Sequence, residues 1–276
     1  MRKPQTQTLY LSDLLYSTKY ENFTYNFTKN LDDNKILYKF CNNTKDIWMV
    51  DFMPVRFKNN ALVKFRYTPD YLINSIVYRS TITDGLAVSD RLGLKPQISN
   101  LNIDGGNLIQ TDKHLFMTEK VFRENPDYTR DQIVEELKNL SGLEPVFFEY
   151  DTRDKIAHAD GYIRYAGNNL IILNEFDKYD GHYAPKLTKM VRSLGYDIVY
   201  MPCGVPVKAG PFNAIGVYIN YLKINDLILV PQFGLKEDVM AIRISREIFI
   251  GCEVVAVNCK EIAKDGGVLN CISWII

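Results

Sequence analysis

The sequence predicts a mixed α/β fold made of five similar modules arranged around a central axis. Two observations support this prediction. Short polar or glycine-rich clusters recur along the chain, and their markers are separated by 53, 56, 56 and 55 residues: Asp51, Asp104, Asp160, Gly216 and Cys271. Each cluster also adjoins an apolar, strand-like run. A near-constant period in this range is typical of repeat architectures. Closure of five units around an axis would bring all five clusters to one site.

The third and fourth units also share residues. The pattern Tyr162-Ile163-x-Tyr165 followed by Asn169-Leu170-Ile171 recurs as Tyr218-Ile219-x-Tyr221 followed by Asn225-Asp226-Leu227-Ile228. Five such units account for nearly the whole chain and no Pro/Gly/Ser-rich linker divides it, so we expect one domain over residues 1–276. The alternative is that turns of an ordinary mixed fold recur at similar distances without any repeat.

The composition is that of an ordinary globular protein, with 46% hydrophobic and 24% charged residues. The 33 basic and 33 acidic residues balance without a basic block, so we expect neither a nucleic-acid partner nor binding to an anionic membrane. The five cysteines are widely spread, which favours a reducing compartment over a disulfide framework or a zinc ribbon. The chain shows no secretory signal and no apolar run long enough to cross a bilayer, so it is predicted to be cytoplasmic.

Alternating apolar residues predict the first strands. The run Thr44–Val55 has this alternation, so we expect a strand that carries Asp51. Residues 61–67 alternate in the same way and should form the returning strand. Before these strands, residues 11–15 predict a short helix followed by a polar, Asn-rich stretch. After them, residues 70–95 should hold one or two helices.

The clearest helix begins at Thr129, which forms a capping box with Gln132. Its apolar face consists of Ile133, Val134, Leu137 and Leu140. Gly142 should end it, and a strand over residues 145–150 should follow.

The remaining elements repeat the order of strand, strand, helix and strand. We expect a hairpin over residues 162–173, a helix that ends at Gly195, and a strand over 198–202. A second hairpin with arms 217–222 and 227–230, a helix over 238–249 and a strand over 253–257 then lead to the last cluster.

Cys271 is a candidate nucleophile. It follows the Gly266-Gly267 turn, where the backbone can fold tightly and approach a bound group. A thiol placed in this way can react if a histidine and anionic groups reach it from elsewhere in the fold. Such a turn with a nearby cysteine is also common as plain structure.

Asp51 and Asp160 are a candidate clamp for a flat, cationic substrate. A guanidinium group has five N–H donors in a planar fork, and two carboxylates can grip two of its edges. This grip would fix the central carbon for attack, and the positive charge would favour the thiolate form of Cys271. A metal site fits less well, because one histidine would be mixed with soft and hard ligands. Each carboxylate alone could instead cap a turn.

His158 is the candidate general acid and base. It lies two residues before Asp160 on what should be one strand, so both side chains should point to the same face. The histidine would protonate departing ammonia and later take a proton from the attacking water. The alternative is a hydrogen-bonded structural histidine. Trp48 and Asn107 are candidate substrate contacts, although Trp48 also suits core packing and Asn107 a tight turn.

Together these motifs resemble one enzyme family. The motifs are Trp48-x-x-Asp51, Asp104-Gly105-Gly106-Asn107, His158-x-Asp160-Gly161 and Gly266-Gly267-x-x-Asn270-Cys271. Their order over nearly the full chain is similar to that of the agmatine deiminase and bacterial-type peptidylarginine deiminase family, guanidino-group-modifying enzymes with the pentein fold.

The resemblance implies a five-bladed α/β propeller of ββαβ modules around a central active site. It also implies a covalent thiouronium intermediate, with Cys271 as nucleophile, His158 as acid and base, and Asp51 and Asp160 as the guanidinium clamp. We expect neither a metal nor a cofactor.

The activity implied is that of a deiminase, which hydrolyses the guanidino group of agmatine, arginine or an arginine derivative to a ureido product and ammonia. The expected partner is therefore a small cationic guanidino compound. Three departures leave the substrate open, because Val50 stands where the family often has Arg, Ala157 where it has Gly, and Asn270 where it has His. An amidinotransferase of the same fold and a non-catalytic pentein are the alternatives, and the sequence does not predict the oligomeric state.

Overall fold

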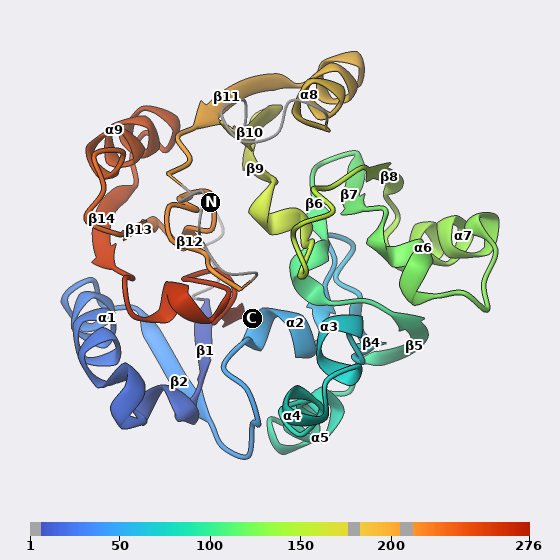
Figure 1. Cartoon of the computed structure of the whole chain (residues 1–276), viewed down its shortest axis with the longest axis horizontal. Helices are drawn as coiled ribbons and strands as arrows, with labels where there is room; N and C mark the ends of the chain where they lie inside the picture. Colours follow the sequence, from blue (N-terminus) through green and yellow to red (C-terminus); the bar gives the residue numbers. More distant parts are fainter. Residues whose placement is uncertain (1–6, 176–182, 205–211) are drawn as a thin grey trace, which may run out of the picture.

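The computed structural model describes residues 7–175, 183–204 and 212–276. Within these residues the strands form five three-stranded sheets. Figure 1 shows the five sheets in a ring around a central axis, with the longer helices on the outside. The predicted mixed α/β fold of five modules is therefore confirmed.

Every sheet has the same topology, in which the middle strand pairs antiparallel with one neighbour and parallel with the other. Four sheets are continuous in sequence: β3 (Val55–Arg56), β4 (Leu62–Arg66) and β5 (Gln97–Asn102); β6 (Ile109–Gln110), β7 (His114–Thr118) and β8 (Glu144–Phe148); β9 (Ile163–Gly167), β10 (Leu170–Asn174) and β11 (Asp197–Met201); β12 (Leu222–Ile224), β13 (Leu227–Gln232) and β14 (Glu253–Asn258). The parallel pair in each sheet requires a crossover connection, and helices supply it.

The fifth sheet joins the two ends of the chain. It contains β15 (Trp274–Ile275), β1 (Thr8–Ser12) and β2 (Leu37–Cys41), with β15 antiparallel to β1. The amide of Thr8 donates to the carbonyl of Ile276 at 2.8 Å, and the amide of Ile276 donates to the carbonyl of Thr8 at 3.1 Å. This pairing closes the ring, so residues near both ends of the sequence belong to one module.

The outer helices connect the second strand of each module to the third. They are α1 (Glu21–Asp33), α3 (Asp70–Ile73), α4 (Ile76–Arg79), α5 (Gly85–Arg91), α6 (Lys120–Glu124), α7 (Arg130–Ser141), α8 (Tyr183–Ser193) and α9 (Asp238–Ile248). The capping box of α7 is confirmed, because Gln132 N–H donates to Thr129 Oγ1 at 3.2 Å and Thr129 N–H donates to Gln132 Oε1 at 2.8 Å. Gly142 ends this helix with a positive φ of 70°, a conformation that glycine adopts without strain.

Two predicted strands were placed wrongly. Asp51 lies in the helical turn α2 (Met49–Phe52), and the extended chain begins only at Val55. Met53 N–H donates to Met49 O at 3.2 Å, so the backbone closes a helical turn before Pro54. The arm predicted over residues 217–222 starts as a strand only at Leu222, after a turn.

The N-terminal region also differs from the prediction. Residues 11–15 belong partly to β1 and partly to the 3₁₀-helix η1 (Asp13–Tyr16). The Asn-rich stretch after them contains α1, whose buried face includes Phe23, Phe27 and Leu31. These three side chains are spaced at i, i+4 and i+8, the spacing of one helix face, but the polar residues between them hide this pattern. Residues 70–95 hold three short helices instead of one or two.

The largest buried apolar cluster ties the ends of the chain to the fourth module. It includes Leu9, Leu15, Phe27, Ile228 and Ile272, each 0% exposed. Because these side chains come from distant parts of the sequence, this core packs the module that closes the ring against the fourth module.

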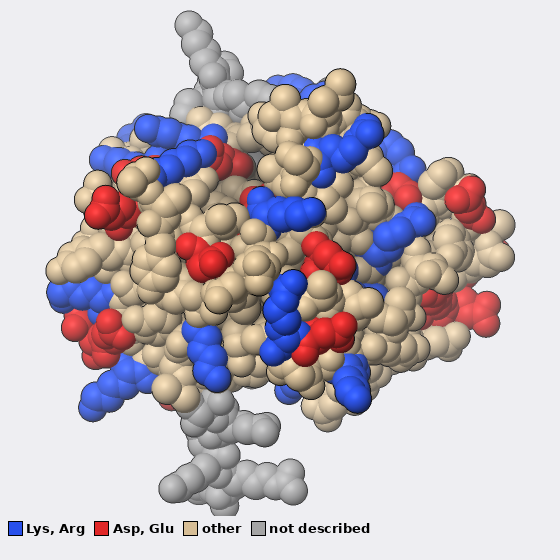
Figure 2. All heavy atoms as spheres, turned by 90° about the horizontal axis from the view of Figure 1, so that it is seen from below, with Lys and Arg blue, Asp and Glu red and all other residues tan. Residues whose placement is uncertain are grey.

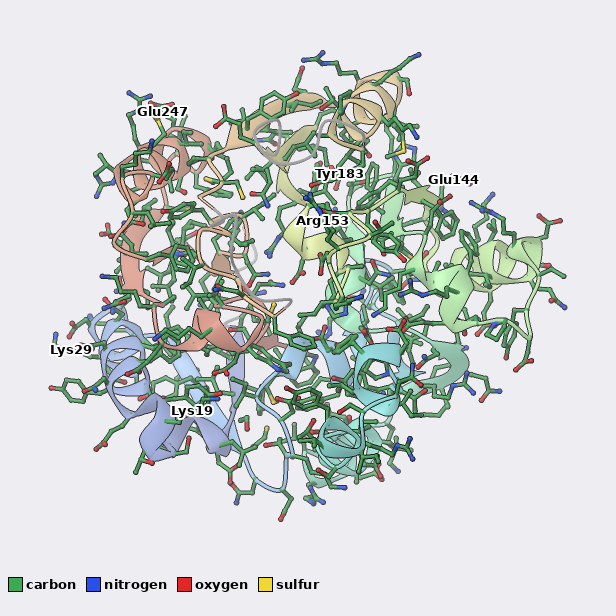
Figure 3. All side chains as sticks on the ribbon, in the orientation of Figure 1. Lys19, Lys29, Glu144, Arg153, Tyr183 and Glu247 are labelled. Atoms are coloured by element: carbon green, nitrogen blue, oxygen red, sulfur yellow. The ribbon has the colours of Figure 1, made fainter. Side chains whose placement is uncertain are left out.

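Charged residues of both signs are interspersed on the face shown in Figure 2. In Figure 3, Lys29, Glu144 and Glu247 lie on outer parts of three modules, whereas Arg153 lies near the centre of the ring. No helix in the described residues is both long and apolar enough to cross a membrane.

Candidate active site

Five turns, one from each module, lie at the inner side of the ring. The turns are α2 before β3, η3 (Gly105–Asn107) before β6, η4 (Ala159–Gly161) before β9, residues 217–221 before β12 and residues 268–273 before β15. Each turn directly precedes the first strand of its sheet. This repeated position explains the period of the polar clusters in the sequence.

His158 lies between two carboxylates that come from two other modules. Its Nε2 is 2.7 Å from Asp104 Oδ2, and its Nδ1 is 3.4 Å from Asp51 Oδ1. All three side chains are buried, with 4%, 1% and 6% of the residue exposed for His158, Asp104 and Asp51. Asp104 thus orients the ring through one nitrogen and leaves the other beside Asp51. The sequence prediction assigned no role to Asp104 beyond a tight turn.

The premise that His158 and Asp160 lie on one strand is wrong. Asp160 lies in the 3₁₀-helix η4, and His158 is the residue that precedes this helix. The two side chains still converge, because a Cβ placed on Gly106 would lie 2.9 Å from His158 Nδ1 and 3.4 Å from Asp160 Oδ2. The tight turn, and not the alternation of a strand, brings them together.

Two glycines allow this close packing. Gly106 N–H donates to Asp51 Oδ1 at 2.9 Å, and a Cβ on Gly106 would lie 2.7 Å from the same oxygen. A Cβ on Gly267 would lie 2.9 Å from Cys271 Sγ and 2.7 Å from the Trp48 ring. Contacts this short are sterically forbidden, so both positions require the absence of a side chain.

Cys271 lies beside Asp160. The thiol Sγ donates to Asp160 Oδ2 over 3.7 Å. The same oxygen accepts from Asn270 Nδ2 at 2.7 Å and from Asn220 Nδ2 at 3.0 Å. Asn220 Oδ1 in turn accepts the N–H groups of Asn270 at 3.2 Å and Cys271 at 3.3 Å. Two asparagines therefore fix the carboxylate and the thiol relative to each other.

The fourth module does not contribute Gly216, its marker in the sequence, to the site. Gly216 packs against the backbone of Gly204, whose N–H donates to Gly216 O at 3.1 Å. The side chain that this module supplies to the site is Asn220, four residues later. In the sequence Asn220 lies within the apolar run 217–222, which was predicted as a strand arm, so the pattern offered no way to choose it.

A cavity of about 320 Å³ brings Trp48, Asp51, His158 and Cys271 together. This volume suits a small molecule. Further residues of its wall are Lys19, Tyr20, Asp46, Tyr71, Tyr78 and Asp265. Trp48 thus lines the cavity, as expected for a candidate substrate contact.

Asp160 and Asn107 do not line this cavity. Asp160 lines a second cavity of about 220 Å³ together with Asn270 and Arg164. Asn107 does not line either cavity, because its Oδ1 accepts Thr118 N–H at 3.0 Å, Thr118 Oγ1–H at 2.9 Å and Ala159 N–H at 3.1 Å. The geometry places Asn107 as a support of η4, in contrast to the expected substrate contact.

Burial and neighbouring charges shift the protonation of the site. Burial raises the pKa of Asp51 to about 7, although His158 opposes this rise. Burial would also raise the pKa of Asp104, but Lys120 and His158 outweigh it and lower that pKa to about 2. Burial would lower the pKa of His158, but Asp51 and Asp104 raise it to about 9. The imidazole is therefore protonated at neutral pH.

The thiol has the opposite tendency. Burial raises the pKa of Cys271 well above its ordinary value, and the charges of Asp160 and Asp51 add to this rise. The thiol is therefore neutral in the free protein. In the parts of the chain that the structure describes, no three His, Cys, Asp or Glu side chains form a group that could hold a metal ion.

Several known deiminases are similar to this chain in sequence. A family model described as Porphyromonas-type peptidyl-arginine deiminase matches residues 16–276. The agmatine deiminase of Stutzerimonas stutzeri is 43% identical over 58 residues, which cover 21% of this chain and 16% of that protein. The agmatine deiminase of Medicago truncatula is 26% identical over 208 residues, which cover 63% of this chain and 54% of that protein. The chain thus spans less than two thirds of the length of these relatives.

A solved structure shows the same fold. The agmatine deiminase of C. jejuni with substrate bound has a TM-score of 0.77 and 17% identity, over 98% of this chain and 93% of that chain. The expected pentein fold is confirmed by this likeness. Because the family model spans nearly the whole chain, this protein belongs to the Porphyromonas-type peptidyl-arginine deiminase family.

Proposed function

We propose that this protein hydrolyses the guanidino group of a small cationic compound to a ureido group and ammonia. The observation that supports this most directly is the position of Cys271. Its Sγ lies 3.7 Å from the Asp160 carboxylate, and the residue lines the cavity that Asp51 and His158 also line. A thiol, a histidine and one carboxylate line this cavity, and the second carboxylate, Asp160, lies directly behind the thiol; these are the groups needed to bind a guanidinium and attack its carbon.

The two carboxylates bind the planar cation. Asp51 and Asp160 both approach Gly106, since a Cβ there would lie 2.7 Å and 3.4 Å from their oxygens. Each carboxylate accepts N–H groups from one edge of the guanidinium through charge-assisted hydrogen bonds. The central carbon then lies next to Cys271 Sγ.

Substrate charge activates the nucleophile. In the free protein, burial and the nearby carboxylates keep Cys271 protonated. A bound guanidinium offsets those negative charges, so the thiol gives its proton to solvent water as the cation binds. The thiolate attacks the central carbon and forms a C–S bond.

His158 then moves two protons. Protonated Nδ1 donates to the departing amino group, the C–N bond breaks, and ammonia leaves a thiouronium on Cys271. The neutral imidazole next takes a proton from water as that water attacks the same carbon. The C–S bond breaks, and the ureido product and the free thiol are released. Asp104 holds Nε2 throughout, at 2.7 Å.

The sequence departures fit this scheme. Asn270 donates to Asp160 at 2.7 Å, so it supports the clamp from the position before the nucleophile. Val50 N–H donates to Cys271 O at 3.2 Å, a backbone contact that does not depend on its side chain. Ala157 is buried with a positive φ of 54°, at the start of the turn that carries His158.

We further propose agmatine, or another guanidino compound with a second cationic end, as the substrate. Asp46 lines the same cavity and accepts Ile47 N–H at 2.7 Å, and burial raises its pKa to about 7. Asp265 on the same wall is already paired with Lys19 at 2.8 Å. Among the described residues Asp46 has no ion pair within 4.0 Å, so a terminal ammonium group would supply its missing partner.

Incubation with agmatine, arginine and arginyl peptides tests these proposals. Ammonia and a ureido product should appear together with agmatine, and a Cys271→Ala variant that folds normally should form neither. Product formation that requires an added acceptor amine would instead favour an amidinotransferase. If no guanidine tested were hydrolysed, the result would favour a non-catalytic binding protein.

His158→Ala separates binding from chemistry. The variant should still bind a guanidine, because the carboxylates remain, but it should not release a ureido product. Mass spectrometry should find either unmodified protein or an adduct on Cys271. A wild-type rate in this variant would contradict the acid–base role.

A further inference from the structure

A buried lysine lies behind the catalytic histidine. Lys120 is the first residue of α6, and its side chain is 0% exposed. Its Nζ lies 3.1 Å from Asp104 Oδ2, 3.4 Å from Glu124 Oε1 and 3.8 Å from Asp70 Oδ1. A lysine is almost never fully buried unless it is paired, so this position calls for a specific role.

Lys120 and His158 share one oxygen. Asp104 Oδ2 accepts from Lys120 Nζ at 3.1 Å and from His158 Nε2 at 2.7 Å. The other oxygen, Oδ1 of Asp104, is buried and has no hydrogen-bond partner in the described structure. The carboxylate is therefore oriented through Oδ2 alone. Without Lys120, His158 would be the only hydrogen-bond partner of the Asp104 carboxylate among the described residues. That carboxylate could then not hold His158 in a fixed orientation.

The other two carboxylates near Lys120, Asp70 and Glu124, depend less on its positive charge for their ionisation. Asp70 pairs with Arg123 at 2.7 Å. Burial raises the pKa of Glu124 to about 7, so this group is partly neutral at physiological pH. The ammonium of Lys120 thus acts chiefly on Asp104, which burial would otherwise push toward its neutral form.

Other charged and titratable groups face the pair from neighbouring elements. Lys64 from β4 and the buried Tyr67 interact with the charge of Asp104 through space. His158 faces Asp51 from α2 at 3.4 Å and the ring of Tyr71 from α3 at 6.0 Å between centroids. Lys120 Nζ lies 4.5 Å from the centroid of the same Tyr71 ring. None of these groups replaces the donor that Lys120 gives to Asp104.

We propose that Lys120 is a positioning residue for the deimination: it holds the Asp104 carboxylate ionised and in the orientation that fixes His158 for proton transfer. This inference rests on the proposed function. Lys120 does not line the substrate cavity and acts only through Asp104. Its loss should therefore affect chemistry more than substrate binding.

The test compares Lys120→Met with Lys120→Arg and with Lys64→Met in the full chain. Lys64 is a matched control, because it is a second buried lysine, 7% exposed, that donates to the backbone oxygen of Phe65. It has no ion pair within 4.0 Å in the described part of the chain, and it interacts with the charge of Asp104 only through space, without a hydrogen bond to that carboxylate. K64M controls for the loss of a buried lysine as such.

K120M should lower kcat by about 10-fold or more, as expected when a general acid–base is poorly oriented, while KM for agmatine changes much less. The acid limb of the kcat–pH profile should move to higher pH, because Asp104 then gains a proton more easily. K120R should restore part of kcat, and K64M should move the profile much less than K120M, because Lys64 does not donate to Asp104. Equal profiles for K120M and K64M would overturn the proposal.

The effect of Lys120 on Asp104 can also be measured without enzyme turnover, so this test does not depend on the proposed function. Carbon-13 NMR of the Asp104 carboxyl in substrate-free protein should show its titration moving to higher pH in K120M and much less in K64M, because only Lys120 donates to Asp104. If the wild type hydrolyses no guanidine, the proposed function fails, while this titration still decides the role of Lys120. If K120M does not fold, Lys120→Gln, which removes the charge but keeps a polar side chain at this buried position, takes its place, and an unchanged Asp104 titration in it would refute the proposal.

Discussion

Asn270 Nδ2 lies 2.7 Å from Asp160 Oδ2, one residue before the thiol that donates to the same oxygen. The amide therefore belongs to the structure that sets the distance between carboxylate and nucleophile. Asn220 reaches this oxygen from another module at 3.0 Å. Neither amide carries a charge, so the two hydrogen bonds position Asp160 without pairing it with a cation, as the proposed guanidinium clamp requires.

The first prediction concerns this amide. Asn270→Ala should lower kcat/KM about 10-fold, because one hydrogen bond to a charged group is lost and Asp160 gains freedom to rotate. Asn270→Asp should lower it further, since it places a second carboxylate beside Asp160. Steady-state kinetics with agmatine measure both effects.

Asn125→Ala is the matched control for that experiment. Asn125 is also buried, and its Nδ2 donates to Asn102 O at 2.9 Å and to Val121 O at 2.8 Å, away from the substrate cavity. It should lose stability without a comparable loss of kcat/KM. Equal kinetics for N270A and the wild type would show that Asn270 is not part of the clamp.

The second prediction concerns pH. Asp51 must be ionised to bind the cation and has a raised pKa of about 7. His158 must be protonated to act as the acid and has a raised pKa of about 9. The kcat/KM profile should therefore rise through about pH 7 and fall through about pH 9. If kcat/KM did not fall between about pH 8 and pH 10, the assignment of His158 as the acid would be contradicted.

The same histidine affects stability. Its folded pKa lies above the ordinary value of 6.5, so its charged form stabilises the fold fully below about pH 6.5. This contribution should be lost as pH rises through about 9. Urea denaturation of the wild type and of His158→Gln should therefore differ most at low pH and converge at alkaline pH.

Much of the ring was predictable because the modules repeat. Each site turn precedes the first strand of its sheet, so the clusters around Asp51, Asp104 and Asp160 recur with the module length. Hairpins and the helix that begins after Thr129 follow from local patterns and capping residues. The closure of the ring by β15 and β1 was not predictable, because it joins residues near opposite ends of the sequence.

The details of the site depend on contacts between modules. Asp104 reaches His158 across 54 positions of sequence, and Asn220 reaches Asp160 across 60. A turn of three or four residues has no periodicity from which side-chain direction can be read. For this reason the prediction identified the clamp and the thiol as candidates but did not identify the residues that orient them.

The third prediction concerns Gly106. Gly106→Ala should destabilise the protein by about 1–3 kcal/mol, the usual cost of overpacking, because its Cβ would lie 2.7 Å from Asp51 Oδ1 and 2.9 Å from His158 Nδ1. Activity should fall with it, since both side chains, which the proposed function assigns to substrate binding and proton transfer, must move. Gly161→Ala is the control, because a Cβ there meets nothing within 4 Å. Urea denaturation of the two variants measures the difference, and equal stabilities would show that the site tolerates a side chain at position 106.

The last prediction concerns the far end of the substrate. Asp46→Asn should raise KM for agmatine by about 10- to 100-fold, the range expected for the loss of a hydrogen bond between charged groups. Butylguanidine has the same guanidinium without the terminal ammonium, so its KM should change little in the same variant. Because burial raises the pKa of Asp46 to about 7, KM of the wild type for agmatine relative to butylguanidine should fall as pH rises through about 7. Steady-state kinetics of both compounds between about pH 6 and 8 measure this ratio. An equal rise of KM for the two compounds in D46N would place Asp46 in the general structure of the cavity wall, and the second cationic end would then have to be bound elsewhere or be absent from the substrate.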